Sequence, residues 1–255
     1  MILRRLADAI KGQNWFTVVL EILIVVVGIF MGLQVNDWNQ ARQDRTVEMR
    51  YLERLHTDLL TDWSRLDRSE VLTTIRMRQV ELLLGGIADT EVAASQPNQF
   101  IEAVEKVSWG SYRPITPKAY AELVGTGKTA LIRSESLRDS LAEYYALIDY
   151  WDEVLDQSSF AREYSIATAG VLDIDHLAII QTSGSATGDA DLGADSGDAI
   201  SIAEQLKSRA QGTRLLPMIH ASHFLVTIVI AEHRQRNEAL RIAIEEQLNG
   251  ERNDP

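Results

Sequence analysis

The sequence predicts an all-α protein in which one N-terminal transmembrane helix continues into a long amphipathic helix, packed with further helices as an antiparallel helical bundle. Three observations support this fold class. A long apolar run lies near the start of the chain, and a segment of helical periodicity without proline or glycine follows it. The 255 residues include only 5 prolines and 15 glycines, and the alternation typical of strands is scarce.

Residues 16–35 form the apolar run, and Glu21 is the one acid in it. A helix of about 20 apolar residues crosses the hydrocarbon core of a bilayer, whereas the apolar part of a secretory signal has only about 7–15. Trp15 and Trp38 bracket the run, as indole rings do at membrane–water interfaces. No small-residue cleavage site follows, so we expect an uncleaved signal anchor.

The flanking charges bear on the orientation of this helix. Residues 1–15 carry Arg4, Arg5 and Lys11, and the other flank also carries arginines, interleaved with acids. The number of basic residues on each side of the helix therefore does little to decide its orientation in the membrane. Because a short basic tail is readily retained, we expect residues 1–15 to be a cytoplasmic tail and the large domain to lie outside the cytoplasm.

The apolar run has a patterned stripe. Glu21, Gly28 and Gly32 recur at helical spacing, and the two glycines form a small-xxx-small element that allows close approach of two helices in lipid. One hypothesis is self-association through this stripe, with Glu21 facing the partner. The alternative is that Glu21 reaches the headgroups and the glycines are incidental.

Residues 36–86 predict a long juxtamembrane helix, with Leu52, Leu55 and Leu59 on its apolar side. Gly85 and Gly86 are expected to end it. Residues 87–98 then read as a loop and residues 99–109 as a short helix, the start of a helical domain over 87–181.

Within that domain, Thr116 and Pro117 are a start signal for a helix that ends at Gly125. Ser134 or Ser136 is expected to cap a longer helix that runs towards Leu155.

Residues 182–198 are acidic, of low complexity and without apolar periodicity, so they predict a flexible loop. Residues 199–255 are expected to supply the C-terminal helices of the same domain, the last of them starting at Pro217. The apolar patch 224–231 is too short to span a bilayer and is expected in the core. The sequence therefore predicts one span.

Composition excludes several functions. The net charge is −12 and the first residues are basic, so the anchored part is strongly acidic, which argues against nucleic acid as a partner. The chain has no cysteine, which excludes disulfides, thiolate metal sites and thiol catalysis. No catalytic, cofactor-binding or metal-binding motif is found, so no cofactor is expected.

Residues 125–129, Gly-Thr-Gly-Lys-Thr, resemble the end of a phosphate-binding loop. The motif requires a glycine where Glu122 stands, and it requires a preceding strand. A turn between two helices is the better interpretation.

Other polar residues are weaker candidates. His220 and His223 could share a helical face, but His233 lies off it, so buried or interface histidines are favoured over a metal site. Carboxylates recur on two helices, which we interpret as solvated faces: Asp58 with Asp62, and Asp149 with Asp152. A further acidic set lacks the glycine and closing glutamate of a calcium loop: Asp189, Asp191, Asp195 and Asp198.

Two stretches of the chain form an ordered pair of motifs. The first runs from Glu21 to Asn39 and continues through Tyr51 to Leu59. The second contains these residues: Tyr120, Leu123, Thr126, Gly127, Leu131, Ile132, Leu137, Leu141, Tyr144 and Tyr145. Together they resemble a bacterial family of single-span membrane proteins of unknown function, and Leu20 and Gly125 depart from its pattern. The resemblance implies a membrane protein with one N-terminal span and a helical domain, and it implies no activity. With the orientation expected from the flanking charges, the domain would lie in the periplasm, anchored in the bacterial inner membrane.

Two functional hypotheses follow. The first is an interaction or scaffold protein whose partners are the lipid bilayer, a second copy bound through the transmembrane helix, or other envelope proteins. The second is an anchored enzyme or ligand-binding domain, with a site around His220, His223 and the 144–151 helix. The absence of motifs favours the first.

Overall fold

The computed structural model describes residues 15–112, 115, 117–155, 158–182 and 190–252. Within these ranges all regular structure is helical, which confirms the all-α prediction. The chain divides into two compact units, Met1–Tyr51 and Leu52–Pro255, and the division falls inside helix α2 (Trp15–Ala88). This single helix contains both the predicted transmembrane segment, 16–35, and the whole of the predicted juxtamembrane helix, 36–86.

In the first unit, α2 presents apolar side chains on all of its sides. The large apolar residues from Val19 to Val35 each expose between 44% and 65% of their surface. Burying one such side chain is worth roughly 1.5–3 kcal/mol, so this much apolar surface is unfavourable in water. The segment is therefore compatible with a membrane anchor.

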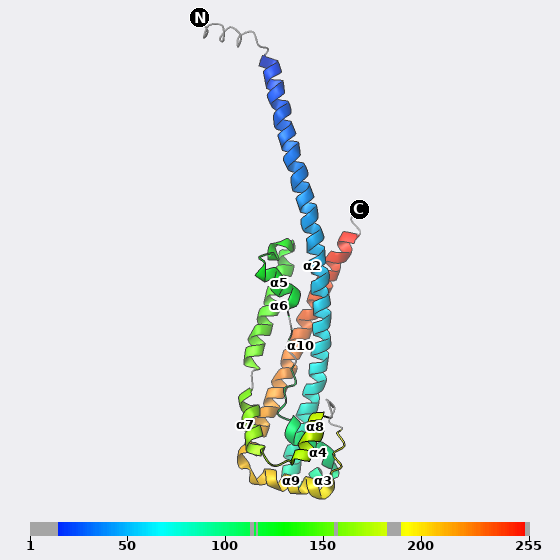
Figure 1. Cartoon of the computed structure of the whole chain (residues 1–255), viewed down its shortest axis with the longest axis vertical. Coiled ribbons are helices and arrows are strands. Elements are labelled where there is room, and N and C mark those ends of the chain that lie inside the picture. The colour runs from blue at the N-terminus through cyan, green and yellow to red at the C-terminus, as the bar shows by residue number, and fades with distance from the viewer. Residues whose placement is uncertain (1–14, 113–114, 116, 156–157, 183–189, 253–255) are drawn as a thin grey trace. The chain divides into compact units, whose positions relative to one another are not determined.

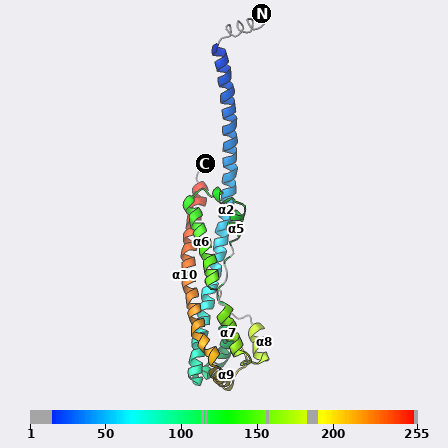
Figure 2. The ribbon, with the colours of Figure 1, turned by 90° about the vertical axis from the view of Figure 1, so that its left-hand side faces the viewer.

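In the second unit, three long helices form the bundle: α2 from Leu52 onward, α6 (Glu135–Val154) and α10 (Ala210–Arg252). Figures 1 and 2 show α6 and α10 side by side. The residue numbers of three contacts rise along α2 as they fall along α10, so these helices are antiparallel: His56 with Glu245, Asp67 with Arg234, and Glu81 with His220.

The bundle core follows the predicted apolar stripes. Leu52, Leu55 and Leu59 of α2 are fully buried, together with Leu141 of α6 and Ile244 of α10. The prediction of an antiparallel helical bundle is thereby confirmed. Leu66, Leu72 and Leu83 of α2 are buried as well, whereas Leu60 and Leu84 are exposed.

Short helices close one end of the bundle, as Figure 1 shows for α3, α4, α8 and α9. Their bounds are α3 (Thr90–Ser95), α4 (Pro97–Lys106), α7 (Ser158–Thr168), α8 (Ile174–Thr182) and α9 (Ser196–Ser208). They share one apolar cluster with the end of α2 and the start of α10, with Phe100, Ile101 and Tyr164 among its buried members. Towards the other end lie α5 (Lys118–Gly125) and the 3-10 helix η1 (Thr129–Leu131).

Helix α2 does not end at Gly85 and Gly86 but at Ala88. Gly86 serves a close approach between helices: a Cβ at this position would lie 2.3 Å from Cε2 of Phe100 in α4. The predicted loop 87–98 contains α3, which Asp89 caps by accepting a hydrogen bond from the Glu91 N–H. The prediction that Gly85 and Gly86 end the helix is wrong because glycine is favoured both at a turn and at a close contact between two helices.

The predicted start of the last helix, at Pro217, is also wrong. α10 begins at Ala210, and Pro217 lies inside it. A proline within a helix costs about 3 kcal/mol, and the burial of Leu215, Leu216 and Ile219 around it offsets that cost. The predicted cap of α6 is confirmed, because Ser134 Oγ accepts a hydrogen bond from the Leu137 N–H. The predicted cap at Thr116 lies outside the described residues.

The acidic segment 182–198 is only partly what we expected. Residues 183–189 lie outside the described residues, but residues 190–194 are packed against α4. The Asn98 side-chain oxygen accepts hydrogen bonds from the N–H groups of Leu192 and Ala194, at 3.2 and 3.1 Å. Asp195 then forms a capping box with Asp198, which starts α9. Two acids of the segment, Asp195 and Asp198, thus begin a helix.

Two helices are long and apolar enough to cross a membrane, within Val19–Ala88 and Ala210–Gly250. Length and composition alone are weak evidence, since the core helix of a bundle passes the same test. In α10, 39% of the apolar window is buried. Val226, Val229 and Ile230 lie in the core, as expected for the 224–231 patch, while Phe224 and Ile228 are exposed.

Candidate functional site

The predicted association stripe lies in the first unit. Glu21, Gly28 and Gly32 are exposed residues of α2, and a Cβ added to either glycine would meet no atom within 4 Å. The helix surface at the glycines is therefore open to a close neighbour. Association through this stripe stays a prediction.

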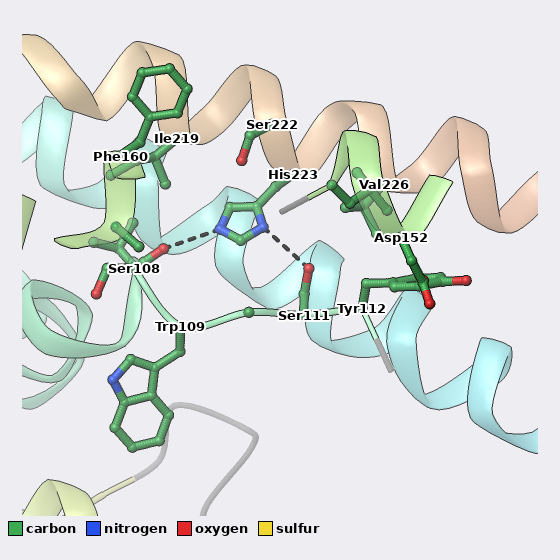
Figure 3. A pocket seen from close by; sticks show the side chains of 14 residues that line it. Ser108, Trp109, Ser111, Tyr112, Asp152, Phe160, Ile219, Ser222, His223 and Val226 are labelled. Atoms are coloured by element: carbon green, nitrogen blue, oxygen red, sulfur yellow. Dashed lines mark hydrogen bonds between the residues drawn. The ribbon is translucent and has the colours of Figure 1, made fainter. Parts of the chain in front are cut away.

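The second unit contains a cavity of about 440 Å³. It lies where the segment that follows α4 passes between the end of α6, the start of α7 and α10, and Figure 3 shows the side chains around it. Its apolar lining comprises Val107, Trp109, Leu155, Phe160, Ala161, Ile219 and Val226. Its polar lining comprises Ser108, Ser111, Tyr112, Asp152, Ser222 and His223.

His223 holds the segment 107–111 onto α10. One ring nitrogen, Nε2, lies 3.1 Å from the carbonyl oxygen of Val107, and the other, Nδ1, lies 3.2 Å from Ser111 Oγ (Figure 3). A carbonyl only accepts, so Nε2 carries the proton and Nδ1 accepts from the serine hydroxyl. Burial lowers the pKa of His223, and the neighbouring Arg76 and His220 lower it further. The ring is thus neutral, with both nitrogens engaged.

Two side chains of the cavity have polar atoms without a partner in the described part of the chain. These atoms are the phenolic oxygen of Tyr112 and Oδ1 of Asp152, both of them buried. Burial raises the pKa of the Tyr112 hydroxyl, and the negative charges of Asp152 and Asp62 raise it further. Burial also raises the pKa of Asp152, with a further contribution from Asp149. An unpaired buried polar group costs about 1–3 kcal/mol.

Trp109 lies beside a group of buried charges. Lys106 and Glu102 of α4 form a buried ion pair, and Glu102 Oε2 also accepts a hydrogen bond from the Ala190 N–H at 3.2 Å. Lys106 and Arg76 both lie within about 6 Å of the Trp109 ring, and neither lines the cavity. Burial lowers the pKa of Arg76 to about 10, although Glu102 opposes the shift. Through Glu102, this group also binds the backbone of Ala190 to α4.

A second polar group is buried in the bundle core. Asn237 donates from Nδ2 to the carbonyl oxygen of Leu59 at 3.0 Å and to the Tyr144 hydroxyl at 3.3 Å. His233 donates from Nδ1 to the carbonyl oxygen of Val229 at 2.8 Å. The rings of Tyr112 and His233 lie 6.3 Å apart, so Tyr112 connects this group to the cavity. Its members cross-link the three long helices.

The structure separates the residues of the second functional hypothesis. His223 lines the cavity, whereas His220 faces Glu81 of α2, with 3.5 Å between Nε2 and Oε1. Tyr144 belongs to the bundle core. No group of three or more histidine, aspartate or glutamate side chains in the described ranges is placed to hold a metal ion.

The interpretation of the paired carboxylates as solvated faces holds for Asp149, which is exposed, and is wrong for Asp62, which is buried. Asp62 is buried in the bundle, and Asp58 Oδ2 accepts a hydrogen bond from the Ala119 N–H, at the first turn of α5, at 2.8 Å. Asp152 faces the cavity and has a raised pKa, whereas Asp149 is exposed. The sequence shows only the spacing of these acids along their own helix. Their burial depends on which other helix packs against them.

The turn interpretation of residues 125–129 is confirmed. The Lys128 N–H donates to the Leu123 carbonyl, and the Gly127 N–H donates to that of Val124. Gly127 has a φ of +67°. This is the Schellman arrangement that ends many helices, and it explains the glycine without a phosphate.

Tyr112 and Ser111 were missed by the sequence reasoning. They follow Trp109 in a segment without helical periodicity, and a loop that carries aromatic and hydroxyl residues is a common place for a binding site. This loop composition was the feature of the sequence that could have indicated Ser111 and Tyr112 as site residues.

Fold and cavity define a helical-bundle protein with an exposed apolar N-terminal helix and a small amphipathic site. The chain belongs to the Family of unknown function (DUF6090), which matches residues 21–166. No curated protein and no solved structure matches the chain.

Proposed function

We propose that the protein is a single-pass protein of the bacterial inner membrane that presents its helical bundle outside the cytoplasm as an interaction or scaffold domain. The observation that supports the anchor is the exposure of every large apolar side chain from Val19 to Val35. Lipid is the surrounding in which such a helix needs no protein partner on any side.

Membrane extraction tests the anchor. The full chain, expressed in a bacterial host, is expected to stay in the membrane pellet after an alkaline wash and to dissolve in detergent. The double variant Ile24→Lys, Ile29→Lys is expected to leave the pellet, because charges at the centre of a span cost about 2.5–3.5 kcal/mol each. A matched variant with leucine at both positions should behave as the wild type. Release of the wild-type chain by the wash would contradict the anchor.

Fusions test the orientation. Alkaline phosphatase joined after Pro255 is expected to be active and a green fluorescent protein at the same place dark, because the first matures outside the cytoplasm and the second inside. The reverse pair of results would place the bundle in the cytoplasm and refute this part of the proposal.

A further inference from the structure

The first turns of α2 beyond its apolar run carry an aromatic and a basic side chain on one face. Val35 is the last residue of the run, and Trp38 and Arg42 follow it at steps of three and four residues, so the three lie one above another on the helix. Trp38 exposes 66% of its surface, and Arg42 is exposed as well. This face is therefore open to its surroundings directly beyond the apolar run.

The side chain of Arg42 reaches back over Trp38. Its guanidinium carbon, Cζ, lies 5.9 Å from the centre of the Trp38 ring, a distance typical of a cation–π contact. Because side chains of a helix lean towards its N-terminus, the charged group lies closer to the level of Trp38 than the Arg42 backbone does. Trp38 is about 4.5 Å of helix beyond Val35. The headgroup region is about 5–7 Å thick on each side of a bilayer, so in the anchored protein the guanidinium lies at headgroup level.

The local charge on this face is positive. The neighbours of Arg42 on the helix surface, three or four residues away, are Trp38, Asn39, Arg45 and Thr46. None of these neighbours is acidic. The acids of the same stretch, Asp37 and Asp44, are five and two residues from Arg42 and therefore lie on the opposite side of the helix.

The stacked guanidinium keeps its hydrogen-bond donors. The Trp38 ring lies against the flat face of the group, whereas its five N–H donors lie in its plane, at the edge. Such a planar fork binds phosphate through two parallel hydrogen bonds. At headgroup level, a phospholipid supplies that phosphate.

We propose that Trp38 and Arg42 form a binding site for the phosphate group of a phospholipid. Trp38 holds the guanidinium at headgroup level, and Arg42 donates to the phosphate oxygens. The inference rests on the proposed membrane anchor and adds a specific lipid contact to it. Both residues belong to the unit Met1–Tyr51, and the contact is the same whichever side of the membrane the bundle occupies. Phosphatidylglycerol is favoured over phosphatidylcholine, because its phosphate has no ammonium group of its own beside it.

Lipid retention tests the proposal. The full chain in detergent is loaded with an equimolar mixture of phosphatidylglycerol and phosphatidylcholine that have the same acyl chains, and the bound lipids are counted by native mass spectrometry. The wild type is expected to retain phosphatidylglycerol roughly fivefold over phosphatidylcholine, the factor that one basic side chain contributes at an anionic surface. Equal retention would refute the proposal. Displacement of the lipid by millimolar inorganic phosphate at constant ionic strength would show a site for free phosphate and would refute the lipid assignment.

Matched variants locate the contact. Arg42→Gln removes the charge and is expected to bring the retention of the two lipids close to parity. Arg50→Gln removes the same charge from an exposed position about 12 Å further along α2, and it should change the preference less than twofold. A loss of equal size in both variants would show general electrostatic attraction and would refute the site.

Trp38→Leu tests the role of the ring. It is expected to weaken the preference for phosphatidylglycerol by an intermediate amount, because Arg42 keeps its charge but loses the group that holds it in place. A preference equal to that of the wild type would refute the part assigned to Trp38.

The alkaline wash of the wild-type chain separates this inference from the anchor. A chain that stays in the membrane pellet but retains both lipids equally would overturn the phosphate site alone. A chain that the wash releases would overturn the anchor, and the phosphate site with it.

Discussion

His223 Nε2 and the carbonyl oxygen of Val107 lie 3.1 Å apart, so a side chain of α10 satisfies the backbone of the residue that directly follows α4. The same ring accepts from Ser111, which fixes the segment between the two contacts. Replacing His223 by alanine would leave the Val107 carbonyl and the Ser111 hydroxyl without this partner. We expect a loss of about 1–3 kcal/mol in the free energy of unfolding. Urea denaturation of the detergent-solubilised full chain, followed by tryptophan fluorescence, measures it.

His223 also predicts how stability depends on pH. Its pKa is lowered in the folded protein, whereas in the unfolded chain it is about 6.5. Between these two values the unfolded state binds a proton that the folded state does not. The free energy of unfolding therefore falls as the pH drops below about 6.5, by at most about 1.4 kcal/mol per pH unit for one histidine. His233 has a lowered pKa and adds an effect of the same sign, while the raised pKa of Asp152 opposes it at lower pH.

The variant His223→Gln isolates this effect. Its free energy of unfolding is expected to fall less steeply than that of the wild type between pH 6.5 and 5, because one titrating group is gone. Between pH 8 and 7, where neither state protonates this histidine, the two proteins should have parallel profiles. Identical slopes below pH 6.5 would contradict a buried, neutral His223.

Two adjacent glycines of α2 should respond in opposite ways to alanine. A Cβ at Gly86 would lie 2.3 Å from the Phe100 ring, and relieving this overlap is expected to cost about 1–3 kcal/mol. At Gly85 the nearest atom is Val92 Cγ1 at 3.4 Å, an ordinary contact. Gly85→Ala should therefore stabilise the protein by up to about 1 kcal/mol, since alanine is the better helix former. Urea midpoints of the two variants decide the matter, and equal shifts would refute the close approach.

The buried pair of Glu102 and Lys106 should be sensitive to the loss of one partner. Glu102→Gln removes the carboxylate that pairs with the buried ammonium group of Lys106, and we expect a loss of about 3–5 kcal/mol in the free energy of unfolding. The double variant Glu102→Leu, Lys106→Met removes both charges and should recover most of that loss. A double variant less stable than Glu102→Gln would show that the pair, rather than the burial of its stems, holds α4 in place.

The stripe of Glu21, Gly28 and Gly32 is tested by crosslinking. If two copies associate through Gly28 and Gly32, leucine at both positions should reduce the yield of crosslinked dimer in membranes several-fold, because the backbones are then held apart. Val26→Leu enlarges a side chain on another face of the same helix and serves as the control. A dimer yield that is unchanged by the glycine substitutions would exclude this stripe as the contact.

Much of the fold could be predicted because it depends on local pattern. The leucines of α2 repeat at helical spacing, and Ser134 precedes α6 as a capping residue. Where the pattern failed, a distant contact was decisive. Gly86 has to be a glycine because of Phe100, and residues 190–194 are held in place by Asn98. Neither partner is close in the sequence.

The cavity could be predicted only in part. The sequence indicated His220, His223 and the 144–151 helix as candidate site residues. His223 lines the cavity, but the side chain of His220, three residues earlier on α10, lies beside Glu81 of α2. Asp152 and Asp149 look alike in the sequence, yet only Asp152 faces the cavity. Tyr112 lies in a segment without periodicity, so pattern reasoning had no basis for placing it. Which side of a helix is covered depends on the packing of the whole bundle.

The interior of the bundle extends past the stretch that defines the family. Residues 21–166 match the family, whereas Val229, Leu240 and Ile244 of α10 fill the core beyond it. A chain cut at residue 166 would expose the leucine stripes of α2 and α6 to water. The part of the chain that has to fold as one piece is therefore longer than the stretch that matches the family.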